Sequence, residues 1–190
     1  MNGVFEMAEV GEERKNSSRQ IQGSLVEGQV VVSRQEEIDF LSGSGYGVKK
    51  EGAVLLLQAY EALYLAAEKR LRVVANDEEL NFQNLLKVLQ KHEADVWAEF
   101  LLFRDLRERG YVVREGAAGE VSFRVYERGT YPKKAAKYIV FLLREGSPAT
   151  VDRLWNAMRL AQGMKKKLIV AVMDRRGEVV YYSLDQFSPA

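Results

Sequence analysis

The sequence predicts a mixed α/β protein: a small α/β N-terminal domain followed by a C-terminal domain with a mixed sheet and a flanking helix. The chain has 190 residues, enough for two small domains at about 150 residues or fewer each. Hydrophobic residues make up 47% of it, which supplies a real core. Strand-like and helix-like segments alternate along it. We place a loose tail at 1–22, the N-terminal domain at 23–93 and the C-terminal domain at 94–190, with 94–110 as a linking helix.

Turn residues and apolar periodicity divide the N-terminal half into short elements. Residues 24–32 are expected to form a strand or a small hairpin that turns at Glu27-Gly28, and Glu51-Gly52 predicts a hairpin over 48–57. Ser33 and Glu36 have the spacing of a capping box and predict a helix that runs to Leu41. The remaining elements expected here are a helix over 59–70, a strand over 71–75, a helix capped by Asn81 that runs to His92, and a helix over 96–109 that is capped by Asp95 and stopped by Gly110.

The C-terminal half is richer in β-forming residues. The strands expected in it cover 111–114, 121–126, 137–143, 167–173 and 178–184, with Gly116-Ala-Ala-Gly119 as a hairpin signal between the first two. The strands over 137–143 and 167–173 are almost continuously apolar, which is typical of strands buried on both faces. Thr150 and Asp152 open a helix that ends at Gly163, and its expected buried stripe is Val151, Leu154, Trp155 and Met158.

Composition excludes several classes of chemistry. The chain has no cysteine and one histidine, so a disulfide framework, a thiolate metal site and a tetrahedral zinc site lack their ligands. A Ser-His-Asp triad would have to use His92, which we expect to be a solvated residue at a helix end. No phosphate-binding glycine-rich motif is present, so we expect no metal and no cofactor.

No apolar run reaches the length of about 18 residues that a membrane-spanning helix needs, and the absence of cysteine suits a cytoplasmic protein.

The net charge of +1 hides an uneven distribution of charge along the chain. Residues 1–110 carry 14 basic and 19 acidic side chains, a net charge of −5, whereas 111–190 carry 14 basic and 8 acidic side chains, a net charge of +6. The basic half points to a polyanion or a complementary partner. The other interpretation is that charges fall unevenly on two solvated surfaces.

The chemistry that remains is metal-free cleavage of RNA. In that reaction the 2′-hydroxyl attacks the neighbouring phosphate, which requires a base, an acid at the leaving 5′ oxygen and a cation for the phosphate charge. Tyrosine and lysine can fill two of these roles. Phe123–Gly129, Arg159 and the lysine run 165–167 hold such residues within the basic half.

In their order and spacing, several segments resemble the archaeal tRNA-splicing endonucleases. They are Ser42–Gly47 (SGSGYG), Phe103–Val113 (FRDLRERGYVV), Phe123–Gly129 (FRVYERG), Lys137–Val140 (KYIV), Arg159–Val172 and Gly177–Tyr182 (GEVVYY). The resemblance implies a C-terminal domain related to the restriction-endonuclease fold. It also implies cleavage of precursor tRNA at bulge–helix–bulge junctions, which leaves a 2′,3′-cyclic phosphate and a 5′-hydroxyl.

The catalytic triad of this family is Tyr, His and Lys, and the resemblance carries only two of them across. The tyrosine falls on Tyr126 and the lysine on Lys166, but the histidine position is occupied by Ala135. No histidine occurs anywhere in residues 111–190. The chain therefore resembles the structural, non-catalytic subunit of an α2β2 heterotetramer, inactive alone, with Tyr126 and Lys166 as vestiges.

The resemblance also implies contact residues. Arg159 matches an arginine that stacks on a bulged base, and Lys165 and Lys167 add positive charge beside it for RNA. Asp174 and Glu178 lie in a hairpin that docks into the partner subunit in this family, although Arg175 and Arg176 stand between them here. Val180 and Tyr181 lie on the last strand, which the family uses for a second subunit contact.

Two alternative functions stay open. In one, this chain alone is a metal-free endoribonuclease that uses Tyr126 and Lys166 with a substitute acid such as Lys134. An unperturbed lysine, with a pKa of about 10.4, is a poor acid at neutral pH. In the other, the chain is a structured-RNA-binding module with no role in cleavage.

Overall fold

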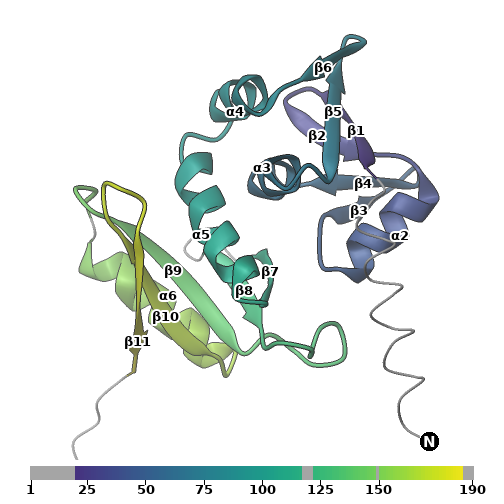
Figure 1. Ribbon diagram of the computed structural model, residues 1–190. Helices are drawn as coiled ribbons and strands as arrows, with labels where there is room; N and C mark the ends of the chain where they lie inside the picture. Colours follow the sequence, from purple (N-terminus) through teal and green to yellow (C-terminus); the bar gives the residue numbers. More distant parts are fainter. Residues whose placement is uncertain (1–19, 117–121, 149, 186–190) are drawn as a thin grey trace, which may run out of the picture.

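The computed structural model describes residues 20–116, 122–148 and 150–185, which form two sheets and five helices (Figure 1). The N-terminal elements are β1 (Ile21–Val26), β2 (Gln29–Val32), α2 (Gln35–Gly43), β3 (Val48–Lys50), β4 (Val54–Leu57), α3 (Ala59–Ala67), β5 (Leu71–Ala75), β6 (Glu78–Leu80) and α4 (Phe82–Gln90). Their six strands follow the order β3-β4-β2-β1-β5-β6, in which only the β1–β5 pair is parallel. The two predicted hairpins are confirmed.

The C-terminal elements are α5 (Val96–Glu108), β7 (Val112–Glu115), β8 (Phe123–Tyr126), β9 (Tyr138–Arg144), α6 (Val151–Gly163), β10 (Lys167–Met173) and β11 (Val179–Leu184). Their sheet follows the order β11-β10-β9-β8-β7. β9 and β10 run parallel and are joined by α6, whereas the other neighbours are antiparallel. The predicted mixed sheet with a flanking helix is confirmed. None of the helices in the described ranges is long and apolar enough to cross a membrane.

Two of the four predicted helix caps form. The Asn81 Oδ1 accepts a hydrogen bond from the Asn84 N–H at 2.9 Å, and the Thr150 Oγ1 accepts one from the Arg153 N–H at 3.3 Å. The Ser33 capping box is wrong, because α2 begins one residue later, after Arg34.

Asp95 does precede α5, but its side chain forms no capping hydrogen bond there. Its carboxylate lies 2.7 Å from the Arg144 guanidinium instead. At the start of the chain, β1 begins at Ile21, inside the segment assigned to the tail, and residues 1–19 of that tail lie outside the described residues. The same holds for most of the expected turn at 116–119.

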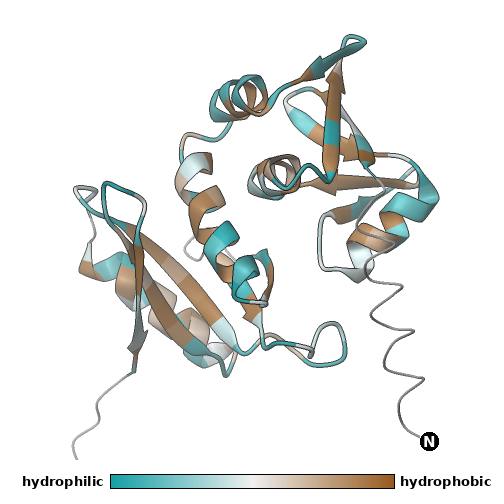
Figure 2. Cartoon of the chain, in the orientation of Figure 1, coloured by the Kyte–Doolittle hydropathy of each residue, from teal (hydrophilic) through white to brown (hydrophobic). Residues whose placement is uncertain are grey.

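One hydrophobic cluster runs from the N-terminal sheet through α5 to the C-terminal sheet, and α5 lies between the two (Figure 1). At its centre are Tyr46, Tyr60, Tyr64, Phe103 and Phe123. The ring of Tyr60 lies 5.0 Å from that of Phe103 and 4.9 Å from that of Phe123. Hydrophobic residues occur along the strands of both sheets (Figure 2), and each sheet contributes buried residues to this cluster. The domain boundary at residue 93 stays a prediction, since the core is continuous across it.

A second cluster joins α6 to the other face of the C-terminal sheet. It consists of Ile139, Phe141, Ala157, Ala161, Leu168 and Val170. The next residues along β9 and β10, such as Val140 and Ala171, belong to the first cluster. Both strands are therefore buried on both faces, as predicted.

The face of α6 that packs on the sheet differs from the predicted one. Val151 is 82% exposed and Trp155 is 48% exposed, whereas Ala157 and Ala161 are buried. Alanines let the helix axis approach the sheet closely, so the small residues mark the contact. Leu154 and Met158 pack at its border. The expected stripe was therefore wrong in Val151 and Trp155.

Two arginines of the C-terminal half hold the glycine-rich 42–47 turn of the N-terminal half. The Arg107 guanidinium donates to the carbonyl oxygen of Ser44 at 3.0 Å. The Arg114 guanidinium donates to the carbonyl oxygen of Gly47 at 2.7 Å. Because both acceptors are main-chain atoms, these contacts fix the path of the turn.

Candidate functional site

The candidate site lies at the end of the C-terminal sheet where β8 ends and where β9 and β10 begin. Val125 pairs with Tyr138, and Tyr138 pairs with Lys167. The Lys137 N–H donates to the Val125 carbonyl at 2.9 Å, and the Lys167 N–H donates to the Lys137 carbonyl at 3.1 Å. These bonds bring the backbones of three segments distant in sequence side by side.

Strand alternation places Tyr126, Lys137 and Lys166 on one face of that sheet end. Val125 faces the core around α5, so Tyr126 faces the side that α6 covers. Lys137 and Lys166 each stand two residues before a residue of the α6 cluster, Ile139 and Leu168. One residue beyond the last paired positions, Tyr126 lies opposite Lys137, and Lys137 lies opposite Lys166. The three side chains therefore stand on neighbouring strands at the same level of the sheet. The structure thus brings together the tyrosine and lysine that the sequence predicts.

The ring of Tyr126 is held by a neighbouring aromatic ring. Tyr131 meets it edge to face, with ring centroids 5.0 Å apart and planes at 85°. The Tyr131 hydroxyl donates to the carbonyl oxygen of Ser42 at 3.4 Å. Gly45 has a φ of +79°, and a Cβ there would lie 3.4 Å from the Tyr131 ring. The 42–47 turn therefore contacts Tyr131, and Tyr131 in turn packs against Tyr126.

Lys166 is positioned by the end of α6. Lys165 adopts a left-handed conformation, with φ of +54°, and the Lys166 N–H donates to the Ala161 carbonyl at 2.8 Å. This closes the helix as a Schellman motif. The half-buried Lys166 lines a small cavity of about 120 Å³ with Met158 and Leu184 among its neighbours. Lys166 therefore lies in the short connection between the end of α6 and the start of β10.

Ala135, at the predicted histidine position, is exposed in the loop between β8 and β9. The following Ala136 is buried and anchors the loop. Lys134 beside it is exposed. His92 lies elsewhere, because its ring packs against Gly28 in the β1–β2 turn: a Cβ on that glycine would be 2.3 Å from the imidazole Nε2. No histidine therefore reaches the site among the described residues.

The sequence prediction missed one ion pair at the site. The Lys137 Nζ donates to the carboxylate of Glu127, and this bond raises the pKa of Lys137 above its usual value. A lysine held in this way stays protonated at neutral pH, so it supplies positive charge and is a poor proton donor. The sequence signal available was a lysine directly before an apolar strand, which is too common to single out.

The predicted RNA-contact residues lie on the surface around this sheet end. Arg159 is exposed on α6, two residues from the buried Ala157 and Ala161, and so faces away from the sheet. Lys165 and Lys167 are exposed on either side of Lys166. Within the described residues, no group of histidine, cysteine, aspartate and glutamate side chains could hold a metal ion.

The charged side chains of the β10–β11 hairpin pair with one another and with Glu145, which follows β9. The Asp174 carboxylate accepts hydrogen bonds from the N–H groups of Arg176 at 2.8 Å and Glu178 at 2.9 Å. The Arg176 guanidinium lies 3.2 Å from both Asp174 and Glu178. Arg175 pairs with Glu145 at 3.6 Å. Asp174 and Glu178, predicted as interface residues, therefore stabilise this turn in the chain itself.

The two predicted interface residues of β11 point in opposite directions. Val180 is 53% exposed, as is its neighbour Tyr182 at 57%. Tyr181 faces α5 and donates from its hydroxyl to the Asp105 carboxylate at 2.6 Å. Burial and this bond raise the pKa of Tyr181. The free face of the edge strand is thus formed by Val180 and Tyr182.

Comparison with known proteins agrees with this architecture over both halves. Residues 21–86 match the family model of the tRNA intron endonuclease N-terminal domain, and 96–181 match that of its catalytic C-terminal domain. The chain is 31% identical over 157 residues to the tRNA-splicing endonuclease of Pyrococcus horikoshii, covering 82% of this chain and 90% of that protein.

Two further relatives show how the length compares. The tRNA-splicing endonuclease of Methanococcus maripaludis is 31% identical over 165 residues, which cover 86% of this chain and 93% of that protein. That of Methanosarcina acetivorans is 31% identical over 165 residues, which cover 86% of this chain but 46% of that protein. With matches to both domain models and to full-length relatives, this chain belongs to the tRNA-splicing endonuclease family.

Proposed function

We propose that this chain is the structural, non-catalytic subunit of a heteromeric tRNA-splicing endonuclease. It positions a histidine-bearing catalytic subunit in an α2β2 assembly and adds basic surface for precursor tRNA. The complex cuts at bulge–helix–bulge junctions and leaves a 2′,3′-cyclic phosphate and a 5′-hydroxyl. The observation that carries the proposal is the site itself, which holds Tyr126 and Lys166 but has Ala135 where the acid/base residue belongs.

The neighbouring lysines do not supply the missing acid. Lys137 is paired with Glu127 and keeps its proton, and Lys134 is exposed in the loop before β9. Removing a positioned acid or base typically lowers a rate by about 10²–10⁴-fold. That loss corresponds to roughly 3–5 kcal/mol of activation free energy. A subunit that lacks this group is expected to be inactive alone.

The basic surface favours a role in holding RNA. Lys166, Lys165 and Lys167 follow one another at the sheet end, and Arg159 lies on the helix beside them. Clustered cations bind phosphates through counterion release, which needs no base-specific contacts. An arginine on the outer face of α6 can also stack on an unpaired base.

The direct experiment uses the full chain and a bulge–helix–bulge RNA in EDTA. The chain alone should give no cleavage, and adding the histidine-bearing subunit from the same source should restore it. In the restored complex, Tyr126→Phe and Lys166→Ala in this chain should change the rate less than about threefold.

Two outcomes would replace this proposal by another. Cleavage by the chain alone, lost in Tyr126→Phe, would make it an endoribonuclease in its own right. Binding of the RNA with no histidine-bearing partner co-purifying from the source would make it a structured-RNA-binding module.

A further inference from the structure

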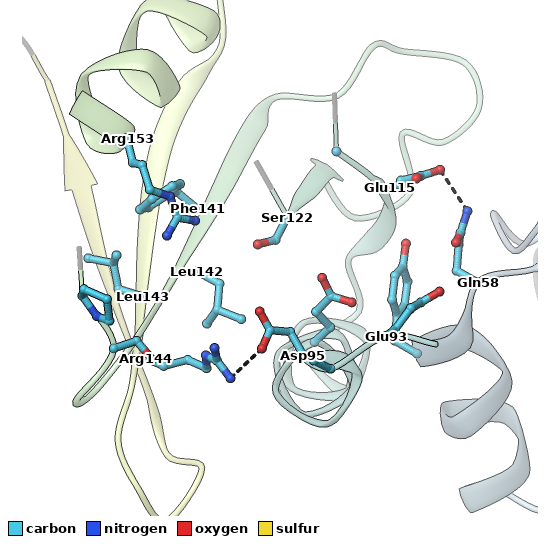
Figure 3. A pocket seen from close by; sticks show the side chains of 16 residues that line it. Gln58, Glu93, Asp95, Glu115, Ser122, Phe141, Leu142, Leu143, Arg144 and Arg153 are labelled. Carbon is cyan, nitrogen blue, oxygen red and sulfur yellow. Dashed lines mark hydrogen bonds and ion pairs between the residues drawn. The ribbon is translucent and has the colours of Figure 1, made fainter. Parts of the chain in front are cut away.

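A second cavity lies away from the sheet end, between the start of α5, the end of β7 and the middle of β9 (Figure 3). Its volume is about 470 Å³. One side carries three glutamates, Glu93, Glu99 and Glu115, which we call the acidic wall. The opposite side is formed by Phe141, Leu142 and Leu143 of β9, with Arg144 and Arg153 at its margin.

The acidic wall has too few cationic partners. Arg144 is already paired with Asp95 at 2.7 Å, and the Arg153 guanidinium lies over the Phe141 ring at 5.5 Å. Glu115 accepts a hydrogen bond from the neutral Gln58 amide at 2.9 Å.

Within the described residues, the carboxylates of Glu93 and Glu99 have neither a hydrogen bond nor an ion pair. Burial, followed by the charges of Glu93, Asp95 and Glu115, raises the pKa of Glu99 to about 7. Burial also raises the pKa of Glu93. The wall therefore holds acidic groups whose ionisation a cation in the cavity would favour.

A buried hydroxyl independently points to a missing ligand. Tyr60 lines this cavity and is 5% exposed, and its hydroxyl has no hydrogen-bond partner in the described structure. Glu99 and Glu115 lie near enough to act on its charge. Buried hydroxyl groups almost always have a partner, because an unsatisfied one is costly. Tyr60 can accept from an ammonium group or donate to a group that enters the cavity.

The chemistry of the walls selects an organic cation over a metal ion. The described residues include no three metal-ligating side chains close enough to share an ion. Instead, the carboxylates of the acidic wall lie on one side of the cavity, and the apolar side chains of Leu142 and Leu143 lie on the other side. An aliphatic chain can pack on such a surface while its ammonium groups reach the carboxylates.

We propose that this cavity binds a linear aliphatic polyamine, with its ammonium groups on the acidic wall and Tyr60 and its methylene groups on the β9 side. The half-buried Glu99 takes the inner ammonium group, with the exposed Glu93 at its outer side. Glu115 exchanges its bond to Gln58 for a bond to the second ammonium group.

The test is a calorimetric titration of spermine into the full chain at pH 8 and low salt. We expect saturable binding at one site. Glu99→Gln and Tyr60→Phe should each weaken the affinity by about tenfold or more, as expected for loss of a charge-assisted hydrogen bond and of a buried acceptor. Glu78→Gln, an exposed glutamate of β6, is the matched control and should leave the affinity unchanged.

Three results would overturn the proposal. They are binding that does not saturate, an equal affinity in wild type and Glu99→Gln, and a similar saturable heat with Mg²⁺ at the same ionic strength. Tyr60→Phe removes an unsatisfied buried hydroxyl, so its unfolding midpoint without spermine should equal or exceed that of wild type. This guards against misreading a folding defect as lost binding. The titration contains no RNA and is independent of the proposed subunit role.

Discussion

At the scale of single residues, the sheet end holds a tyrosine and a lysine in fixed positions beside an exposed alanine. Tyr126 is braced by Tyr131, and Lys166 is fixed by the closing turn of α6. Ala135 projects from the surface of the adjoining loop, so a larger side chain fits there without displacing a neighbour. Residue 135 can therefore accommodate a histidine side chain.

We predict that Ala135→His gives the chain alone a measurable cleavage activity. A histidine at this exposed position can act as acid or base near pH 7, which contributes typically about 10²–10⁴-fold. The measurement is single-turnover cleavage of a bulge–helix–bulge RNA in EDTA. The control is Lys133→His, two residues away in the same exposed loop, which should stay inactive. Equal activity in both variants would contradict the assignment of Ala135 as the vacant position.

Glu61 presents a different case, in which the effect of burial on the pKa of a carboxyl group outweighs the effect of its hydrogen bonds. Its side chain is 1% exposed and accepts hydrogen bonds from the N–H groups of Gly47 at 2.9 Å and Gln58 at 3.0 Å. Burial raises the pKa of Glu61 to about 7, against the opposing effect of these two bonds. The folded state therefore binds a proton that the unfolded state has released above pH 4.5.

It follows that stability should fall as pH rises from about 5 to 8, because the folded state binds more protons than the unfolded state in this window. Glu99, whose pKa is also raised to about 7, acts in the same direction. Glu61→Gln mimics the protonated form and should flatten the slope, whereas Glu78→Gln should not. Urea midpoints across pH 5–8 measure this. A midpoint independent of pH in the wild type would refute it.

The residues of the candidate site could be predicted in part. Tyr126 and Lys166 were predicted because the segments around them resemble those of the endonuclease family, and strand register sets them on one face. The Lys137–Glu127 pair was not predicted, because it depends on how the loop between them folds back. Sequence spacing along a strand predicts a shared face, but it does not predict where the eleven-residue loop between β8 and β9 returns.

At the scale of elements, α6 shows that apolar periodicity predicts the position of a helix better than it predicts the buried face of that helix. The helix, its Thr150 cap and its end at Gly163 were all predicted. The buried face was predicted only in part, because Leu154 and Met158 pack at it, but Ala157 and Ala161 form the sheet contact in place of Val151 and Trp155. A hydrophobicity pattern weights large residues most, whereas close approach to a sheet selects small ones.

Substitutions on the two faces of α6 should therefore differ sharply. Ala157→Leu inserts extra carbons at a fully buried contact with the sheet and should lower the free energy of unfolding by about 1–3 kcal/mol. Val151→Ser, on the exposed face, should change it by about 0.5 kcal/mol or less. Urea unfolding followed by circular dichroism compares them. A larger loss in Val151→Ser than in Ala157→Leu would restore the predicted stripe.

At the scale of the whole molecule, the N-terminal and C-terminal halves share their core and their contacts to the 42–47 turn. Arg107 and Arg114 reach this turn from α5 and β7. Arg114 also lies 4.0 Å from Glu61, which binds the same turn through the Gly47 N–H. The turn that supports Tyr131, and through it Tyr126, therefore depends on both halves.

Arg114→Ala should lower the free energy of unfolding by about 2 kcal/mol, because it removes a charge-assisted bond to a partly buried carbonyl. The matched control is Arg72→Ala, which breaks an exposed ion pair with Glu79 and should cost less than about 1 kcal/mol. Urea midpoints of both variants at pH 7 decide between them. If both variants lose the same free energy of unfolding, the bond from Arg114 to the turn contributes no more to stability than an exposed ion pair.

The shared core also has a consequence for the order in which the protein is made. Tyr46, Tyr60 and Tyr64 are synthesised well before Phe103, the residue of α5 whose ring lies among theirs. At about 5–20 residues per second, the ribosome needs roughly 2–9 s to travel from Tyr60 to Phe103. For those seconds Tyr60 and Tyr64 of α3 lack the helix whose Phe103 packs against them, and a chain that ends before α5 leaves their rings in water.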